Sequence, residues 1–426
     1  MNIILIGSGG REHAFAYKLS QSNLCDKLFI IGGNPGTAQY GTNVPININD
    51  FSIAGKFCLD NEIDLVIVGP EEPLVKGIRD FFNADSKLKS IGFIGPDKIG
   101  AQLEGSKDFS KAFMQKFNIP TAKYRTFTFD NIHEGVDYVQ AHSLPVVLKA
   151  DGLAAGKGVL ICESNDEAVN ELEQMIREKK FGDASAKVVV EEFLKGIELS
   201  VFVLSDGNNY KILPSAKDYK RIGEGDKGLN TGGMGAVSPV PFADDAFLKK
   251  VEDRIIIPTI NGLKSEDINY VGFIFIGLMK VGDDPFVIEY NCRMGDPETE
   301  VVLPLIKSDF AEMMKACAEG KLNEYKLEID ERTAATVMLV SAGYPGDYEK
   351  GKKMTGLNLC ENSLLFHAGT KLNEDDILVT NGGRVMAITS FGNNIGEAVS
   401  QSLKNADKIQ FEGKYFRRDI GYEFVN

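Results

Sequence analysis

The sequence of 426 residues lacks several features that mark common classes of protein. It contains no Trp and only four His in unrelated contexts, so a histidine-based metal site is not expected. Its six Cys are scattered without a Cys-x-x-Cys pair, which argues against a zinc site and against the disulfide framework of a small secreted domain. No apolar run reaches the roughly 18 residues that a membrane-spanning helix needs. We therefore expect reduced thiols and a cytoplasmic protein without a membrane partner.

The sequence also has little positive charge. Lys and Arg total 47 against 61 Asp and Glu, which gives a formal net charge of −14. Proteins that bind nucleic acids gather Lys and Arg to neutralise phosphates, so we expect no nucleic-acid partner. Small phosphorylated ligands are compatible with this charge, because a few amides and cations suffice to bind them. The balance of 43% hydrophobic and 25% charged residues is typical of a globular protein, and we expect a monomer of more than one packed unit.

Short apolar runs alternate with helical stretches in the N-terminal part of the chain. Residues 3–6, 28–31 and 64–68 are predicted strands, and each is followed by a loop rich in Gly or Pro. Strands separated by helices predict a parallel sheet. Ligands of such sheets bind beyond the carboxyl ends of the strands, so we expect a small-molecule site on these loops.

The pattern changes further along the chain. Residues 145–149 and 158–162 are predicted to form two antiparallel strands within a small unit from about 121 to 190. A long loop is expected at residues 223–241. After about residue 330, short strands separated by turns predict an α+β domain.

The connection between the two antiparallel strands is rich in glycine and reads KADGLAAGKG from Lys149 to Gly158. It differs from a phosphate-binding P-loop, because only three residues separate Gly152 from Gly156 and predicted strands flank both sides. We interpret it as a flap whose amides, together with Lys149 and Lys157, close over a triphosphate. A glycine-rich hairpin with solvated lysines is the alternative.

Two predicted strands carry polar groups suited to a nucleotide. Residues 188–194 (VVVEEFL) offer a backbone edge between apolar side chains, which suits a purine, although acidic strand ends are also common in proteins. In residues 287–293 (VIEYNCR), alternation places Glu289, Asn291 and Arg293 on one face. Two oxygen ligands followed by a cation suit Mg²⁺ bound to substrate phosphates, and the arginine can hold an anion or a developing phosphoryl charge. A partly buried acid–arginine pair is the alternative.

Two further loops are candidates for binding an anion. The charged run at residues 217–221 (KDYKR) precedes a glycine-rich stretch at 228–235, and this arrangement suits either a lid over an anionic substrate or a plain surface charge run. The N-terminal GSGGRE at residues 7–12 resembles part of a dinucleotide-binding fingerprint, but Glu12 stands at the third glycine position. We interpret it as a phosphate site at a helix N-terminus with Arg11 nearby.

Taken together and in this order, these segments resemble the ATP-grasp superfamily and, within it, the phosphoribosylamine–glycine ligase family. The similarity covers essentially the whole chain. The matching motifs are GSGGREHA (7–14), GGNPGTA (32–38), GPEEPL (69–74), KADGLAAGKGV (149–159), NTGGMGAVSP (230–239), GDPET (295–299), FHAGT (366–370) and GGRV (382–385). Many motifs in register are far more specific than any one of them.

The resemblance implies the ATP-dependent ligation of glycine to 5-phosphoribosylamine through glycyl phosphate, in de novo purine biosynthesis, with Mg²⁺ or Mn²⁺ as cofactor. It implies an N-terminal α/β substrate-binding domain (1–104), an ATP-grasp domain (105–330) whose small subdomain spans about 121–190, and a C-terminal α+β domain (331–426). Another ATP-grasp carboxylate–amine ligase or carboxylase is the alternative within the superfamily. An NAD(P)-dependent oxidoreductase is the alternative from a different class.

The resemblance also assigns roles to individual residues, position by position. The residues assigned to ATP are Lys107, Lys149, Gly156, Lys157, Gly158, Glu191, Phe193, Leu194 and Glu198. The metal ligands are Glu289 and Asn291, and the catalytic residues are Arg293, Asp218 and Lys220. The residues assigned to the other small-molecule substrates are Gly9, Gly10, Arg11, Asn34, Pro35, Gly36, Pro70, Glu71, Gly233, Met234 and Gly235.

The sequence departs from the family pattern at a few of these places. The loop usually written Gln-Asp-His-Lys-Arg contains Lys217 and Tyr219 here. Met294 and Glu300 replace the usual Phe and Gln of a neighbouring signature. Gly277 stands where many ATP-grasp enzymes carry another acidic metal ligand, so a second magnesium ion would depend mostly on ATP and water.

Overall fold

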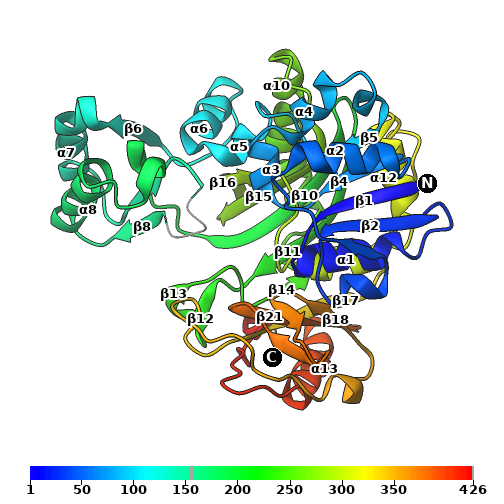
Figure 1. Ribbon diagram of the computed structural model, residues 1–426. Coiled ribbons are helices and arrows are strands. Elements are labelled where there is room, and N and C mark those ends of the chain that lie inside the picture. The colour runs from blue at the N-terminus through cyan, green and yellow to red at the C-terminus, as the bar shows by residue number, and fades with distance from the viewer. Residues whose placement is uncertain (154–157, 425–426) are drawn as a thin grey trace.

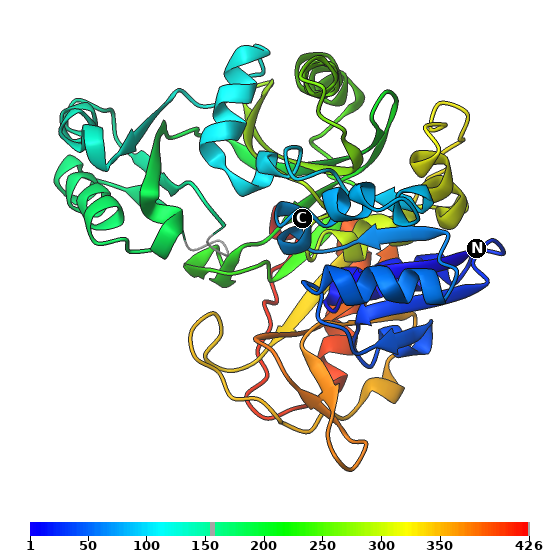
Figure 2. The same ribbon diagram turned by 45° about the horizontal axis from the view of Figure 1, so that its top comes forward.

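The computed structural model describes residues 1–153 and 158–424, and it combines a five-stranded, an eight-stranded and a four-stranded sheet with helices packed around them. Figure 1 shows the four-stranded sheet and its two helices standing apart from the main body, and Figure 2 shows the same separation from a second direction. The predicted fold class, a parallel α/β unit followed by mixed helices and sheets, is confirmed.

The N-terminal sheet is parallel, with the strand order β3-β2-β1-β4-β5. Its strands are β1 (Asn2–Gly7), β2 (Lys27–Gly32), β3 (Thr42–Val44), β4 (Leu65–Val68) and β5 (Gly92–Ile94), and its helices are α1 (Gly10–Leu19), α2 (Phe51–Asp60), α3 (Glu71–Val75) and α4 (Ile78–Ala84). The three strands predicted from apolar runs are present as β1, β2 and β4. The short β3 carries no apolar run, and only its pairing with β2 makes it a strand.

The four-stranded sheet is antiparallel, with the order β6-β9-β7-β8. It comprises β6 (Tyr124–Thr128), β7 (Val146–Ala150), β8 (Val159–Cys162) and β9 (Lys187–Glu192), and α7 (Ile132–Gln140) and α8 (Asn165–Arg177) pack against it. The prediction of two antiparallel strands around the glycine-rich connection is confirmed by the pairing of β7 with β8. We call this unit the small subdomain.

The eight-stranded sheet runs through the centre of the molecule in the order β16-β15-β10-β11-β14-β17-β21-β18. Its strands are β10 (Ile197–Asp206), β11 (Tyr210–Asp218), β14 (Gly235–Ser238), β15 (Val271–Val281), β16 (Asp284–Asn291), β17 (Thr333–Val340), β18 (Ser363–His367) and β21 (Arg384–Gly392). The prediction of a loop over residues 223–241 is wrong in part, because β14 lies fully buried between β11 and β17. The C-terminal strands therefore continue the same sheet.

The remaining elements connect these sheets and cover them. The helices are α5 (Gln102–Gly105), α6 (Lys107–Lys116), α9 (Asp245–Val251), α10 (Ile257–Ser265), α11 (Thr299–Val302), α12 (Phe310–Ala318) and α13 (Ile395–Lys408), and the short strands are β12 (Arg221–Gly223), β13 (Lys227–Asn230), β19 (Thr370–Leu372) and β20 (Leu378–Thr380). In the described part of the chain, none of the helices combines the length and the apolar character needed to cross a membrane.

Helix α1 joins the N-terminal sheet to the rest of the molecule. Its Phe15 is buried, with its ring centroid 5.5 Å from that of Phe273 on β15 and 5.6 Å from that of Phe310 on α12. On another side, the backbone amide of His367 in β18 donates a hydrogen bond of 2.7 Å to Nδ1 of His13. Helix α1 therefore packs against both the N-terminal and the C-terminal parts of the chain.

The two histidines at this contact are held neutral. Burial lowers the pKa of His13 to about 3, with a smaller contribution from His367, and burial lowers the pKa of His367 to about 4. His367 Nδ1 also lies 2.9 Å from the hydroxyl of Thr370, so both rings are hydrogen-bonded in the folded protein. Protonation of either ring would place a charge in a buried contact between distant segments.

We predict that acid destabilises the protein through these histidines. The unfolded chain binds protons below a pKa of about 6.5, while the folded protein does not, so the free energy of unfolding should fall by up to about 1.4 kcal/mol per pH unit for each histidine as the pH drops from about 6.5 toward the folded-state values. The amide oxygen of Asn can replace the Nδ1 acceptor. His13→Asn should therefore remove the contribution of one histidine to the pH dependence of the free energy of unfolding, which urea unfolding at several pH values measures. His133→Asn, on the exposed face of α7, is the control and should leave the slope unchanged. Equal slopes for His13→Asn and the wild type would contradict the assignment.

Candidate active site

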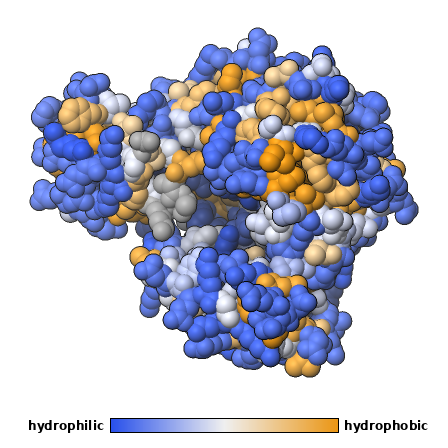
Figure 3. Space-filling model, viewed as in Figure 1, coloured by the Kyte–Doolittle hydropathy of each residue, from blue (hydrophilic) through white to orange (hydrophobic). Residues whose placement is uncertain are grey.

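A cavity of about 790 Å³ lies where the N-terminal loops, the small subdomain, strand β16 and strand β21 meet. Figure 3 shows this hollow between the small subdomain and the lower part of the body, with hydrophilic residues at its base. Many of the residues predicted from the sequence line it: Arg11, Glu71, Lys107, Lys149, Gly158, Glu191, Asp218, Lys220, Glu289, Asn291 and Arg293. Segments separated by most of the chain length therefore contribute to one site.

The other predicted residues lie around the cavity or outside the described part of the chain. Gly156 and Lys157 fall outside the described residues. The predicted residues that do not line the cavity are Gly9, Gly10, Asn34, Pro35, Gly36, Pro70, Phe193, Leu194, Glu198, Gly233, Met234 and Gly235. Asn34 shapes its own loop, because its side-chain amide donates to the carbonyl of His367 (2.8 Å) and its side-chain oxygen accepts from the amide of Gly36 (2.8 Å). The roles of these residues in binding stay predictions.

Arg293 sits at the centre of a partly buried cluster of charges. Its Nη2 donates to Glu104 Oε1 over 2.7 Å, and its Nε donates to Glu71 Oε2 over 3.2 Å. The second oxygen of Glu104 accepts from the backbone amide of Cys292 over 2.8 Å. Burial opposes the charge on Arg293, but the two carboxylates outweigh it and raise the pKa of Arg293 above its ordinary value. Glu104 was missed by the sequence interpretation, since a lone glutamate before a glycine carries no signal.

Glu289 and Asn291 at the end of strand β16 and Arg293, two residues beyond it, all line the cavity, and Ile288 and Tyr290 between them line it as well. The segment that follows the strand adds Asp296 and Glu298 to the lining. Burial, then the charge of Asp218, raises the pKa of Glu298 to about 8. The cavity therefore has an acidic wall that extends beyond the strand.

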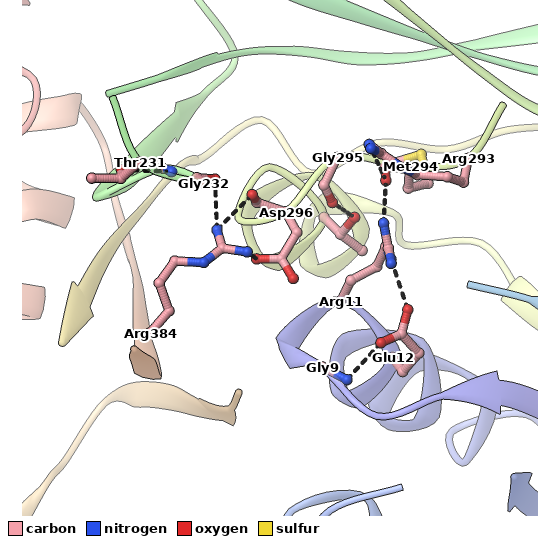
Figure 4. A network of polar contacts seen from close by, with 12 residues as sticks. Gly9, Arg11, Glu12, Thr231, Gly232, Arg293, Met294, Gly295, Asp296 and Arg384 are labelled. Atoms are coloured by element: carbon pink, nitrogen blue, oxygen red, sulfur yellow. Dashed lines mark hydrogen bonds and ion pairs between the residues drawn. The ribbon is translucent and has the colours of Figure 1, made fainter. Parts of the chain in front are cut away.

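Two arginines hold this acidic segment from opposite sides, as Figure 4 shows. Arg11 donates from Nη1 to the carbonyl of Met294 (3.1 Å) and from Nε to Glu12 (2.7 Å). Arg384, at the start of β21, donates from Nη1 to the carbonyls of Gly232 (2.6 Å) and Asp296 (2.7 Å), and its Nη2 lies 2.9 Å from Asp296 Oδ1. The N-terminal loop and a C-terminal strand thus fix the same stretch of chain.

The glycines of the NTGGMG motif are required by this packing. A Cβ on Gly232 would lie 2.9 Å from Arg384 Cζ, and a Cβ on Gly233 would lie 2.4 Å from Pro297 Cδ. Gly233 also has a φ of +115°, which side chains disfavour. The backbone of the motif therefore packs directly against Arg384 and Pro297. Thr231 and Gly232 line the cavity.

Lysines from α6 and from the small subdomain surround another wall of the cavity. Lys149 Nζ lies 3.0 Å from Glu191 Oε2 and donates to the carbonyl of Ile288 over 3.2 Å. Lys111 Nζ lies 3.1 Å from the same oxygen of Glu191. Burial lowers the pKa of Lys107 and lowers that of Lys111 to about 8. Lys111 was missed, although it lies one helical turn after Lys107 on the same face of α6, a spacing that could have indicated it.

Lys220 lies between two carboxylates on the remaining side. It pairs with Glu198 and lies 3.8 Å from Asp218. Burial acts against its charge, but the carboxylates of Asp218 and Glu198 outweigh burial and raise the pKa of Lys220 well above its usual value. Burial raises the pKa of Asp218. Lys220 therefore stays cationic and can hold an anionic group at the edge of the cavity.

The residues that depart from the family pattern point away from the cavity. Lys217 pairs with Glu423 (2.9 Å) and lies 4.2 Å from the ring centroid of Tyr219, whose hydroxyl donates to Glu423 over 2.8 Å. Met294 is buried in an apolar cluster, so it replaces one apolar side chain by another. Glu300 is fully buried, and burial, then the charge of Asp296, raises its pKa well above the ordinary value. A neutral carboxylic acid there is close in shape to the usual glutamine.

In the N-terminal GSGGRE loop, the backbone amide of Gly9 is hydrogen-bonded within the loop itself. Glu12 is buried, and its carboxylate accepts from the amide of Gly9 over 2.6 Å. A Cβ on Gly69 would lie 2.1 Å from the same carboxylate, so Glu12 fills the space above the strand ends. The amide of Gly9 is therefore engaged by Glu12 rather than open to a phosphate, and only Arg11 of this loop lines the cavity.

This combination of fold and site defines a protein of the ATP-grasp class. The family described as phosphoribosylglycinamide synthetase matches the chain with its N domain at residues 1–104, its ATP-grasp (A) domain at 105–299 and its C domain at 334–423. The chain belongs to the phosphoribosylglycinamide synthetase family.

Known proteins are similar over the full length. Phosphoribosylamine–glycine ligase of Pasteurella multocida (strain Pm70) is 44% identical over 429 residues, which cover 100% of this chain and 98% of that protein. The crystal structure of phosphoribosylamine–glycine ligase from Thermotoga maritima superimposes with a TM-score of 0.85 and 36% identity, covering 98% of this chain and 100% of that one. A biotin carboxylase structure from Campylobacter jejuni shares the fold, with a TM-score of 0.71 and 15% identity over 99% of this chain and 94% of that one.

We predict that Glu104→Gln destabilises the protein by about 1–3 kcal/mol, because it leaves the partly buried guanidinium of Arg293 with Glu71 alone. Urea unfolding measures the change, and a double-mutant cycle with Arg293→Met should give a coupling energy above about 1 kcal/mol. Glu72→Gln is the matched control, since Glu72 lines the same cavity but pairs with the exposed Lys76, and it should change stability by less than about 0.5 kcal/mol. Additive effects in the cycle would show that Glu104 and Arg293 do not depend on each other.

Proposed function

We propose that this chain catalyses the ATP-dependent ligation of glycine to 5-phosphoribosylamine, which yields glycinamide ribonucleotide, ADP and phosphate in purine biosynthesis. Full-length similarity to proteins named phosphoribosylamine–glycine ligase supports the reaction. The observation that most supports this chemistry is that one cavity is lined by the cations Lys107 and Lys149 and also by Glu289, Asn291 and Arg293. Cations for phosphates, oxygen ligands for a metal and an arginine for a reacting anion lie within one enclosed site.

The reaction needs a carboxylate to become an electrophile. An oxygen of glycine attacks the γ-phosphorus of ATP, the bond to ADP breaks, and glycyl phosphate forms. The amine of phosphoribosylamine then attacks the glycyl carbonyl carbon, the carbon–nitrogen bond forms, and phosphate leaves as the nitrogen loses a proton. Neither step needs a covalent bond to the protein, so positioning and charge neutralisation are what the site has to supply.

The nucleotide would lie between the small subdomain and β16. Lys107 and Lys149 would contact its phosphates. Glu191, whose Oε1 is buried without a hydrogen-bond partner among the described residues, is suited to accept from an amino group on the base. Phe193 and Leu194 would contribute backbone groups at the adenine, and Glu198 would bind the ribose.

Glu289 and Asn291 would hold Mg²⁺ or Mn²⁺. Both are oxygen donors on the cavity wall, which suits a hard cation. No group of three His, Cys, Asp or Glu side chains suited to a metal occurs in the described residues, and this fits an ion that takes part of its ligands from substrate phosphates. When bound, such an ion neutralises charge on the transferred phosphoryl group. Arg293, held by its two carboxylates, would lie beside the reacting oxygen.

The two smaller substrates would bind on the opposite walls. Asp218 would attract the amino group of glycine, while Lys220 and Arg11 offer cations for carboxylate or phosphate. Glu71 ties Arg293 to the start of α3, so the loop between β4 and α3 would lie close to the reacting groups. The remaining loop residues assigned to substrate (Gly9, Gly10, Asn34, Pro35, Gly36, Pro70, Gly233, Met234 and Gly235) would shape these subsites through their backbone. The proposal includes a cytoplasmic location and a monomeric state, in keeping with reactions of small molecules.

The proposal is tested by ADP release in the presence of ATP and Mg²⁺. Glycine and freshly generated phosphoribosylamine are supplied together, and each is then omitted in turn. A requirement for both, with glycinamide ribonucleotide detected by mass, is the expected result. Turnover with a different carboxylate or amine would show that the protein catalyses another ATP-grasp reaction. An absence of nucleotide turnover under every combination would refute the mechanism.

We predict that Glu289→Ala lowers kcat by at least about 100-fold, because it removes one of two proposed protein ligands of the metal. The thermal unfolding midpoint should stay close to that of the wild type, since Glu289 is only partly buried and contributes little core volume. Asp284→Asn is the matched control on the same strand, where Asp284 pairs with Lys250 and Arg254 away from the cavity. Wild-type activity of Glu289→Ala at saturating Mg²⁺ would remove the metal assignment.

A further inference from the structure

Two connections join the small subdomain to the main body. One enters between α6 and β6, and the other leaves between β9 and β10, and both span the gap between the small subdomain and the body in Figure 1. The two connections are hydrogen-bonded to each other, because the amide of Glu192 donates to the carbonyl of Lys123 over 3.0 Å and the amide of Lys123 donates to Glu192 Oε1 over 2.9 Å. The orientation of the small subdomain therefore depends in part on how this pair of connections is held against α6, which also contacts the subdomain directly where Asp108 bonds to Thr126 and Lys187.

Lys111 on α6 contacts both connections with one ammonium group. Its Nζ donates to the hydroxyl of Thr121 over 2.8 Å and to the carbonyl of Ala122 over 3.4 Å on the entering connection. The same Nζ lies 3.1 Å from Glu191 Oε2 at the end of β9, where the leaving connection begins. Lys111 is 2% exposed, so water does not compete for these contacts.

The contacts of Lys111 continue into the proposed nucleotide site. The hydroxyl of Thr121 donates to the carbonyl of Val287 on β16 over 2.6 Å. Glu191 Oε2, which Lys111 approaches from one side, lies 3.0 Å from Lys149 Nζ. Lys111 is thus one contact away from the lysine proposed to bind phosphate and one contact away from the strand that carries Glu289.

We propose that Lys111 is a positioning residue that fixes the small subdomain, and Lys149 with it, over the nucleotide phosphates. The proposal rests on the proposed ATP site. Lys111 acts through Thr121 and Glu191, which it holds against α6. Without its ammonium group, Glu191 is paired with Lys149 alone, and the two connections lose their shared attachment to the helix.

The charges around Lys111 support a role for its positive charge. The groups that face it are Glu191 and Glu192 from β9, Lys149 from β7, and the ring of Tyr124 from β6, whose centroid lies 5.7 Å from Nζ. Burial lowers the pKa of Lys111 to about 8, Glu191 opposes this effect, and Lys149 adds to it. Since the folded-state pKa lies below the ordinary value, Lys111 is charged below about pH 8 and loses its charge as the pH rises through that value.

The test uses Lys111→Met, Lys111→Arg and the control Lys116→Met in the full-length protein. Lys116 lies on the same helix but is exposed and pairs with Glu266. Calorimetric binding of MgATP, measured from neutral to alkaline pH, is combined with kcat and KM for ATP. We expect Lys111→Met to weaken MgATP binding roughly 10- to 100-fold at neutral pH, with a larger effect on KM than on kcat, as for other groups that orient a binding residue. Lys116→Met should bind as the wild type does.

The pH dependence separates positioning by charge from a purely structural role. The wild type should bind MgATP less tightly above about pH 8, whereas Lys111→Arg should keep its affinity there, because a guanidinium remains charged. Unchanged affinity in Lys111→Met, an equal loss in Lys116→Met, or the same alkaline decline in Lys111→Arg as in the wild type would each overturn the proposal. If Lys111→Met does not fold, the comparison of Lys111→Arg with the wild type still decides it. A wild type that binds no MgATP would refute the proposed function as well, while normal binding without an effect of Lys111 refutes this inference alone.

Discussion

The largely buried charge of Arg293 is the constraint on which the site depends. An arginine in this position needs carboxylates, because an uncompensated charge inside a protein costs several kcal/mol. Glu71 comes from the start of α3, and Glu104 comes from α5, so the charge of Arg293 is paired only when α3, α5 and the segment after β16 are assembled together. The same ion pairs that stabilise this assembly also orient the arginine at the centre of the cavity. Stability and chemistry are therefore coupled at one side chain.

The C-terminal part of the chain belongs to the site rather than to an appended unit. Strand β14 pairs with β11 on one side and with β17 on the other, which makes the large sheet continuous. That continuity brings Arg384, at the start of β21, onto Asp296 and Gly232 at the cavity wall. The small subdomain differs, because it meets the body mainly through two connections and α6, so it is the part whose orientation has to be maintained by a few specific contacts.

Much of the fold could be predicted from local patterns. Apolar runs located β1, β2 and β4, and the glycine-rich connection located the antiparallel pair β7 and β8. Strands β1, β4 and β7 are almost fully buried, and all five strands are bounded by turn residues in the sequence. Strands β3, β11 and β14 were among those missed. The short β3 and β14 are recognisable only by their pairing with β2 and β17, whereas β11 forms a hairpin with β10, which directly precedes it. The limits of the three domains remain predictions, because the continuous sheet crosses the last of them.

The sequence by itself determined which chemistry the site can hold. Its motifs contain the lysines, the Glu-x-Asn-x-Arg segment and the glycine loops, and the spacing of Glu289, Asn291 and Arg293 predicted a shared site, which agrees with their lining one cavity. The tertiary structure decided which other groups join them. It brings Glu104 to Arg293 and Lys111 to Glu191. It also directs Lys217 and Tyr219 toward Glu423, and it hydrogen-bonds the amide of Gly9 to Glu12. The reason is physical, because a local pattern sets the direction of a side chain from its own strand or helix, whereas its partners depend on how distant elements pack.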